Sequence, residues 1–165
     1  MANPKTREFI VTGIITKPSF KIELVERNFD VSKITPALEN VAPLYPNFNV
    51  WLRDKFLRNF YIGDRDILVA HNGSDLCGVS LLKKSIEENK ICTFYVMPKF
   101  QGRELGNKLL EKSLNYFDGK DILISVSNER LSELYPTLSS KGFVLDSCVE
   151  HMYRNENIEH FFKTK

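Results

Sequence analysis

The sequence has few cysteines, and they are not arranged for cross-links or for a metal. The 165 residues include three, Cys77, Cys92 and Cys148, which lie far apart and form no CxxC pair. Disulfide frameworks use an even number of cysteines, and zinc sites usually use closely spaced pairs. The sequence therefore predicts neither disulfides nor a metal site. Cys92 lies in an apolar run, where a free thiol is usually a small core side chain rather than a nucleophile.

Charge of one sign and long apolar runs are also scarce. The formal net charge is +2, and the basic residues form no long run. A nucleic-acid partner is therefore not expected, although folding could still assemble a basic patch. No apolar stretch approaches the ~18 residues of a membrane span. The first residues, MANPKTREF, lack the apolar segment of a secretory signal. We expect a cytoplasmic protein, monomeric or homodimeric, with no membrane partner.

What is present is the composition of one globular domain. The chain is 42% hydrophobic and 12% aromatic, enough for a core at this length. We expect a single domain over 1–165, with 1–8 disordered and 155–165 a tail of ambiguous structure. The expected strands are 9–16, 21–26, 66–71, 76–82, 90–97, 121–126 and a closing hairpin of 143–149 with 151–153. The expected helices are 32–40, 48–60, 105–117 and 128–140.

This order predicts an α+β domain with one mixed sheet. The segments 66–71, 76–82 and 90–97 form an antiparallel meander, because Asn72-Gly73 is a strong hairpin signal. A helix connects 90–97 to 121–126, so these two strands should be parallel neighbours near the centre. Ligands bind where parallel strands diverge at their carboxyl ends. The sequence therefore predicts a ligand site beside these two strands.

The segment 91–117 should supply the chemistry of that site. Its apolar run ends at Pro98, a short loop containing Gly102 follows, and a helix begins near Leu105. The first N–H groups of a helix have no intrahelical partner, and the helix dipole adds positive charge there. Such a strand–turn–helix unit is typical of phosphate sites.

Three groups of residues in this order resemble the GCN5-related N-acetyltransferase (GNAT) family, over roughly 21–153. Val96-x-Pro98 followed by Gln101 to Asn107 is similar to the family's acyl-CoA signature. Asn128 matches a frequent CoA contact, and Lys141-Gly142-Phe143 matches the closing Gly-Phe. The resemblance implies a three-layer fold, with a mostly antiparallel central sheet, a splayed parallel pair and helices on both faces.

The resemblance also implies a cosubstrate and a reaction. Acetyl-CoA would lie between the splayed strands, and an amine of a small molecule or a protein would attack it directly, without a metal. Backbone groups of Tyr95, Val96 and Met97 would bind the pantetheine and polarise the thioester. The remaining implied contacts are Gln101, Gly102, Arg103, Glu104, Leu105, Gly106, Asn107 and Asn128.

The sequence departs from the family pattern at two places. Glu104 replaces the first glycine of the signature, which either stabilises the helix start or repels phosphates. The family's acid, a tyrosine four residues before the closing glycine, is replaced by Leu138. Tyr135, one turn earlier on the face expected to point inward, is our candidate acid. Candidate bases are Glu87, Glu88 and His151, by their proximity to strand ends.

Two other functions remain open. The departures at Glu104 and Leu138 are compatible with a non-catalytic CoA-binding or interaction module on the same fold. Some toxins of the family acetylate aminoacyl-tRNA, and the modest charge argues against that activity. The aromatic residues Tyr45, Phe48, Trp51 and Phe56 are expected beside the acceptor, although their spacing also suits a core face.

Overall fold

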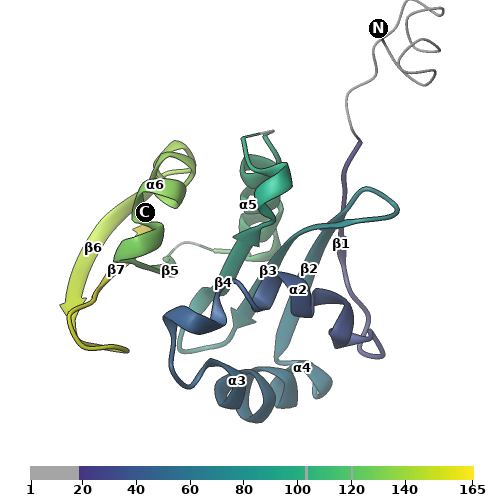
Figure 1. The fold of residues 1–165 in the computed structure, drawn as a ribbon, viewed down its shortest axis with the longest axis horizontal. Helices are drawn as coiled ribbons and strands as arrows, with labels where there is room; N and C mark the ends of the chain where they lie inside the picture. Colours follow the sequence, from purple (N-terminus) through teal and green to yellow (C-terminus); the bar gives the residue numbers. More distant parts are fainter. Residues whose placement is uncertain (1–18, 103, 120) are drawn as a thin grey trace, which may run out of the picture.

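The computed structural model describes residues 19–102, 104–119 and 121–165, so the predicted strand 9–16 lies outside the described residues. Seven strands form one sheet in the order β1-β2-β3-β4-β5-β7-β6 (Figure 1). Of the neighbouring pairs, β4 and β5 are parallel and the others are antiparallel, as predicted. The strands are β1 Lys21–Leu24, β2 Arg65–His71, β3 Leu76–Lys84, β4 Asn89–Val96, β5 Ile122–Ser127, β6 Phe143–Glu150 and β7 Ile158–Thr164.

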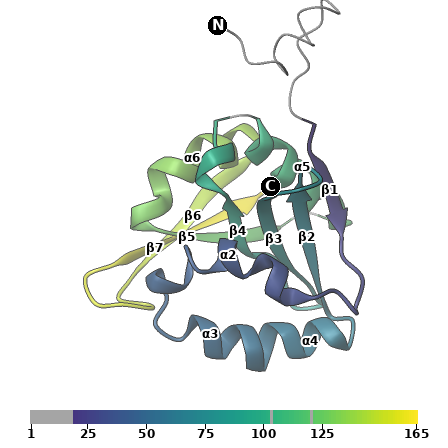
Figure 2. The same ribbon diagram turned by 45° about the vertical axis from the view of Figure 1, so that its right-hand side comes forward.

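Helices cover both faces of the sheet, which confirms the predicted three layers. The long helices α5 (Leu105–Tyr116) and α6 (Leu131–Ser140) lie on one face, and the segments α2 to α4 lie on the other (Figures 1 and 2). These segments are α2 Thr35–Leu38, α3 Phe48–Trp51 and α4 Arg58–Tyr61. Short 3-10 turns span Val31–Ile34, Ala42–Leu44, Pro98–Phe100 and Asn128–Arg130, and a π-helical stretch, Leu52–Leu57, joins α3 to α4.

The region 30–61 follows the predicted helices, which begin in different ways. Asp30 caps the first helical turn, since its Oδ1 accepts from the Ser32 N–H at 3.1 Å. Asn47, which precedes the second helix, makes no side-chain cap bond within the described chain. Phe56 and Phe60 are fully buried, so the apolar stripe rather than the cap holds this helix on the sheet.

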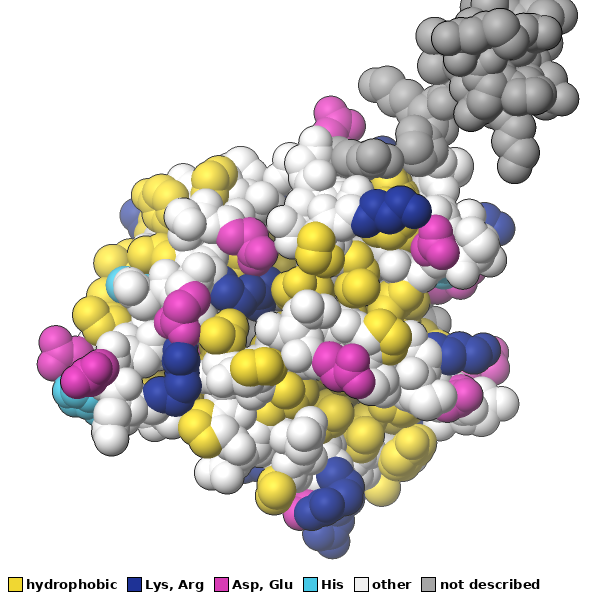
Figure 3. Space-filling model, viewed as in Figure 1, with side chains coloured by type: hydrophobic (Ala, Val, Ile, Leu, Met, Phe, Trp, Pro, Cys, Tyr) yellow, Lys and Arg dark blue, Asp and Glu magenta, His cyan; other side chains and the backbone are white. Residues whose placement is uncertain are grey.

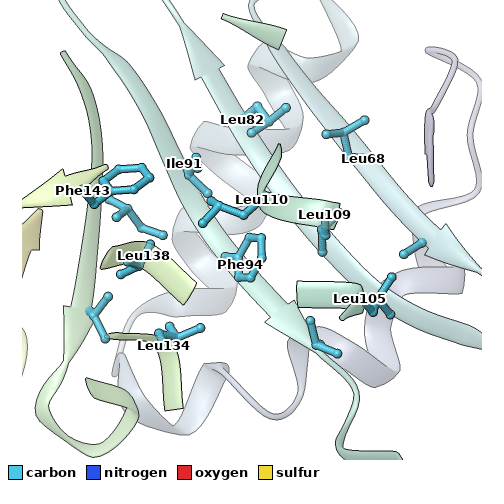
Figure 4. Packing of buried hydrophobic residues seen from close by; sticks show 14 of the residues in the cluster. Leu68, Leu82, Ile91, Phe94, Leu105, Leu109, Leu110, Leu134, Leu138 and Phe143 are labelled. Atoms are coloured by element: carbon cyan, nitrogen blue, oxygen red, sulfur yellow. The ribbon is translucent and has the colours of Figure 1, made fainter. Parts of the chain in front are cut away.

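Two buried clusters hold the layers together. Under α5 and α6, Leu105, Leu109 and Leu110 pack on Ile91 and Phe94 of β4 (Figure 4). On the opposite face, the side chains of 34–60 pack on β2 and β3. The central strands are therefore buried on both faces, which explains their nearly continuous apolar sequences.

The predicted closing hairpin is wrong. Residues 151–153 lie in a turn, and β7 comes from the segment 155–165, which was predicted to be a tail. This strand inserts between β5 and β6. Alternation along β7 directs Phe162 into the core under α6 and Glu159 to the opposite face, and each is 1% exposed. The C-terminal residues are thus an interior part of the sheet.

Candidate active site

The site begins where β4 and β5 separate. They pair at Asn89↔Ile122, Lys90↔Leu123 and Ile91↔Ile124, and no later pair joins them in the described chain. Past this point β4 stays with β3, and β5 stays with β7. A bulge at Cys92, between the pairs Leu82↔Ile91 and Leu81↔Thr93, bends β4 here. The two strands thus present a gap at their carboxyl ends.

Alternation along β4 decides which backbone groups face this gap. The Met97 N–H donates to the Cys77 carbonyl of β3 at 2.8 Å. Backbone groups two residues apart point the same way, so those of Tyr95 and Met97 face β3. Those of Phe94 and Val96 face the gap. Of the three predicted pantetheine contacts, Tyr95 and Met97 therefore have backbone groups that face β3, and those of Val96 face the gap.

Side chains from two loops reach the β4 carbonyls in the gap. Gln101 Nε2 donates to the Val96 carbonyl at 2.9 Å, and Arg130 donates to the Phe94 carbonyl at 2.8 Å. Glu133 lies between the donors, accepting from Arg130 at 2.9 Å and from Gln101 at 3.3 Å. The Arg130 cation therefore offsets the Glu133 charge beside the gap. Arg130 and Glu133 were not identified from the sequence, because only the fold brings them to β4.

The start of α5 lies next to this gap and presents unpaired donors. Glu104 is its N-cap residue, and no side chain among the described residues caps the helix. Glu104 adopts a left-handed conformation, with φ 65° and ψ −5°. The first N–H groups, those of Leu105, Gly106 and Asn107, lack intrahelical partners in any α-helix. This helix end is thus suited to an anion. Arg103, also predicted here, lies outside the described residues.

A cavity of about 510 Å³ lies between the starts of α5 and α6 and the end of β4. Its lining includes six of the predicted contacts, namely Val96, Gln101, Gly102, Glu104, Gly106 and Asn107. Phe94, Glu133, Leu134 and Thr137 complete the wall. The side chain of the predicted contact Leu105 is fully buried in the core instead, so its N–H group is what it can offer to a ligand.

The conformation of Glu104 explains why the family signature has glycine at this position. Residues with a Cβ adopt φ near +65° at a cost of about 1 kcal/mol, whereas glycine adopts it without this cost. We expect Glu104→Gly to raise the free energy of unfolding by about 0.5–1 kcal/mol, measured by urea denaturation. Gly102, with φ 74°, is the matched control, because Gly102→Ala should lower it by a similar amount. Equal stability of the two variants would contradict the left-handed assignment at both positions.

Two predicted residues, Asn128 and Tyr135, do not line the cavity. Asn128 follows β5 and is exposed, with its Oδ1 at 3.2 Å from His160 Nε2. Tyr135 is 51% exposed and packs on Phe162, with ring centroids 6.0 Å apart. Its predicted inward position is wrong because Leu134, one residue earlier, carries the inward stripe of α6. Its role as the acid stays a prediction.

The three predicted bases do not face the gap. Glu88 accepts a hydrogen bond from Lys83 at 2.7 Å, and this bond lowers the pKa of Glu88. Glu87 is exposed. His151 lies in the turn after β6, where its Nδ1 accepts from the Glu156 N–H at 3.0 Å. These contacts fit turn residues rather than a base.

A buried carboxyl, Glu159, lies on the sheet face that α2 to α4 cover. It is opposite Ser127 in the β5–β7 register and accepts from the Tyr45 hydroxyl at 2.9 Å. Burial raises the pKa of Glu159, against the opposing effect of its hydrogen bonds. Burial, with the neighbouring Glu159 charge, also raises the pKa of Tyr45, so that its hydroxyl stays protonated. The Ser127 hydroxyl is buried and has no hydrogen-bond partner in the part of the chain that the structure describes, so this polar cluster has unused hydrogen-bonding capacity.

Tyr45 was predicted to lie beside the acceptor. Glu159 was not identified from the sequence, because 155–165 was predicted to be a tail. Tyr153 packs edge-on against Tyr45, with ring centroids 5.1 Å apart, and Arg130 lies over the Tyr95 ring at 5.1 Å. Phe56 and Phe48 are core residues. The alternation Ile158-Glu159-His160 is the signal from which a strand, and hence Glu159, could have been found.

The described ranges contain neither a metal-ligand group nor a membrane-spanning helix. Among 19–102, 104–119 and 121–165, no three His, Cys, Asp or Glu side chains are grouped to hold a metal ion. No helix in these ranges has both the length and the apolar character needed to cross a bilayer.

Comparison with known proteins agrees with this geometry. Residues 46–161 match the family model described as acetyltransferase (GNAT) domain. No curated protein sequence matches the chain.

Solved structures share the fold at low identity. A GNAT family acetyltransferase from Elizabethkingia anophelis, with acetyl-CoA bound, is 15% identical, with a TM-score of 0.66 over 90% of this chain and 99% of that one. PaiA N-acetyltransferase from Thermoplasma acidophilum, in complex with coenzyme A, is 17% identical, with a TM-score of 0.66 over 89% and 99%. NAA60 from Arabidopsis thaliana, with a bisubstrate analogue, is 14% identical, with a TM-score of 0.58 over 87% and 97%.

Proposed function

The chain belongs to the GNAT acetyltransferase family, and we propose that it transfers an acetyl group from acetyl-CoA to an amine of a small molecule or a protein. One observation carries the proposal. The open strand edge of β4 and the uncapped start of α5 meet at one cavity, which Val96, Gln101 and Gly106 line. In the described chain the β4 edge here contacts the Gln101 and Arg130 side chains but pairs with no strand, and the start of α5 has no side-chain cap. Together they suit a ligand with amides at one end and phosphates at the other.

The chain's own residues define how this cosubstrate would be held. The N–H groups of Leu105, Gly106 and Asn107 would bind the pyrophosphate. The Phe94 and Val96 backbone groups would bind the pantetheine as an added strand would. A Val96 N–H directed at the thioester oxygen would stabilise the charge that develops there, by ~3 kcal/mol in comparable sites.

The sheet face that α2 to α4 cover would supply the base that the acceptor amine needs. An amine must be neutral to attack a thioester, and Glu159 is a buried carboxyl whose raised pKa suits a base. Tyr45 and Ser127 would orient Glu159 and the amine. Glu159 would take the proton from the amine, the nitrogen would bond to the acetyl carbon, and the carbon–sulfur bond would break. The Arg130 cation, beside the gap, would stabilise the departing thiolate. Tyr135 remains the candidate that returns a proton to sulfur.

One observation favours a second function, a CoA-binding module without catalysis. Glu104 and Glu133 both line the cavity, and Arg130 already pairs with Glu133. An unbalanced carboxylate at Glu104 would repel phosphates. A role on aminoacyl-tRNA has less support, because basic and acidic side chains are interspersed on the face shown in Figure 3.

Calorimetric titration with acetyl-CoA tests the proposal, with Glu104→Gly alongside and with release of free CoA measured over a panel of primary amines. We expect micromolar binding by both proteins and amine-dependent CoA release. No binding by either protein would refute the proposal. Binding by Glu104→Gly alone, without turnover of any amine, would support the module.

A further inference from the structure

A cluster of three polar side chains outside the proposed acceptor site has the arrangement of an activated nucleophile. Cys148 Sγ lies 3.3 Å from His160 Nδ1, and His160 Nε2 lies 3.2 Å from Asn128 Oδ1. A nucleophile, a base in contact with it and a third group that orients the base are the three parts that thiol catalysis uses.

The sheet topology brings these residues together from three separate segments. Cys148 of β6 is directly opposite His160 of β7, and His160 is directly opposite Val126 of β5, two residues before Asn128. Cross-strand partners on one face have Cβ atoms about 5 Å apart. Because the contacts follow from strand register, the rigid sheet holds the thiol and the imidazole together.

Hydrogen-bond roles decide which ring nitrogen is the base. The Asn128 Oδ1 can only accept, so His160 Nε2 carries the proton that it donates to this oxygen. The lone pair of the neutral ring is then on Nδ1, which faces the Cys148 thiol. The imidazole is therefore oriented to remove the thiol proton as sulfur attacks an electrophile.

The cysteines differ in access to solvent. Cys148 is exposed on the edge strand, whereas Cys77 is fully buried. Cys92 is partly buried, and burial raises its pKa to about 11, which leaves little thiolate at neutral pH. Access and a neighbouring base thus coincide at Cys148 alone among these three.

From this geometry we propose that Cys148 is a nucleophile for acyl thioesters and becomes S-acylated, with His160 as its base and Asn128 as the residue that positions His160. In this step Sγ bonds to the acyl carbon, and the bond from that carbon to the leaving sulfur breaks. His160 Nδ1 takes the Sγ proton and passes it to the leaving thiolate. One thioester replaces another, so no oxidant or reductant is consumed.

The source of the acyl group follows from the position of Asn128. Asn128 also follows the end of β5, past the point where β4 and β5 separate, and it is a predicted contact of acetyl-CoA. The expectation that acetyl-CoA itself acylates Cys148 rests on the proposed function. The reactivity of the thiol towards a small thioester does not.

The test therefore uses a small probe, the acetyl thioester of N-acetylcysteamine, on the intact native protein. We expect one acetyl group on Cys148, removed by hydroxylamine and located by peptide mass spectrometry. His160→Gln should lower the acetylation rate at least about tenfold, since a positioned base contributes this much or more. Asn128→Ala should lower the acetylation rate by less. The matched control is His151→Gln, which changes a histidine in the adjacent turn, and this variant should react at the wild-type rate.

Acetylation of His160→Gln at the wild-type rate, or the absence of a hydroxylamine-sensitive adduct on Cys148, would overturn the inference. Circular dichroism checks that each variant is folded, and if His160→Gln is not, Asn128→Ala carries the comparison. Iodoacetamide labelling of Cys148 in the same proteins gives a second rate, with the same expected order. A protein that fails to bind acetyl-CoA but shows these rates would refute the proposed function and leave this inference standing.

Discussion

Glu159→Gln is expected to lower kcat for amine acetylation at least about 100-fold while raising the melting temperature at neutral pH. A general base contributes roughly 10²- to 10⁴-fold, and glutamine cannot take a proton. It keeps the shape of glutamate, and its carbonyl can still accept from the Tyr45 hydroxyl. The stability gain arises because the side chain is 1% exposed, and burying a charged carboxylate there opposes folding.

The pH dependence of this effect follows from the direction of the pKa shift. Burial raises the pKa of Glu159 above its value in the unfolded chain, so the folded state binds the proton more tightly. The free energy that protonated Glu159 contributes to folding is complete below the pKa of this group in the unfolded chain. It is lost as the pH rises through the pKa of the group in the folded protein. The excess stability of Glu159→Gln should therefore be present at neutral pH and shrink in acid. Melting temperatures measured across this range provide the check.

Glu150 is the matched control for Glu159. It lies on the neighbouring strand β6, opposite Ile158, and is exposed. Glu150→Gln should leave both kcat and the melting temperature close to wild type. A Glu159→Gln protein that retains wild-type kcat, or that is less stable at neutral pH, would show that Glu159 is a structural acceptor for Tyr45 and not the base.

Gly106→Phe should weaken acetyl-CoA binding at least about 100-fold without unfolding the protein. Gly106 lies in the first turn of α5 and lines the cavity. A Cβ added there would be 3.9 Å from Thr137 Oγ1 and 3.9 Å from Val96 Cγ2. A methyl group thus makes ordinary contacts, whereas an aromatic ring must extend into the space beside the free N–H groups. Calorimetry with acetyl-CoA gives the affinity, and urea denaturation gives the stability.

Gly106→Ala distinguishes the effect of filling the cavity from the effect of replacing glycine in the helix backbone. Alanine favours a helix over glycine by up to about 1 kcal/mol, so this variant should be slightly more stable and bind acetyl-CoA within severalfold of wild type. Wild-type affinity in Gly106→Phe would mean that the ligand does not occupy this cavity. Equal loss in both variants would mean that the backbone at Gly106, rather than the cavity, controls binding.

Local sequence patterns were sufficient for much of the fold. The run before Pro98, the loop with Gly102 and the stripe through Leu105 and Leu109 specify a strand, a turn and a helix from neighbouring residues alone. The chain order then determined the parallel pair, because a helical crossover has one preferred hand. The cavity-lining residues near Gly106 could be predicted because they belong to this strand–turn–helix segment.

The conformation of Glu104 shows how far a motif can specify backbone structure. The motif marked the position as one that normally has glycine, and the structure shows the left-handed φ that favours glycine there. The sequence could not show whether a glutamate would adopt this conformation or displace the helix start, since that depends on the packing of Leu105 and the loop around it.

Contacts between distant segments required the tertiary structure. The hydrogen bond of Tyr45 to Glu159 joins residues 114 positions apart, and that of Arg130 to the Phe94 carbonyl joins residues 36 apart. Both depend on where β4 leaves β5, which no local pattern encodes. Strand β7 was missed because two short polar-apolar segments compete for one place in the sheet, and burial of Phe162 decides between them.

The sequence by itself thus determined a strand–turn–helix unit within an α+β fold, because these features depend on residues close together in the chain. Only the tertiary structure determined which groups face the gap, where a buried carboxyl lies, and that Cys148 meets His160. These features depend on strand register and on the order of β5, β7 and β6. That order is decided by which side chains the whole core can bury.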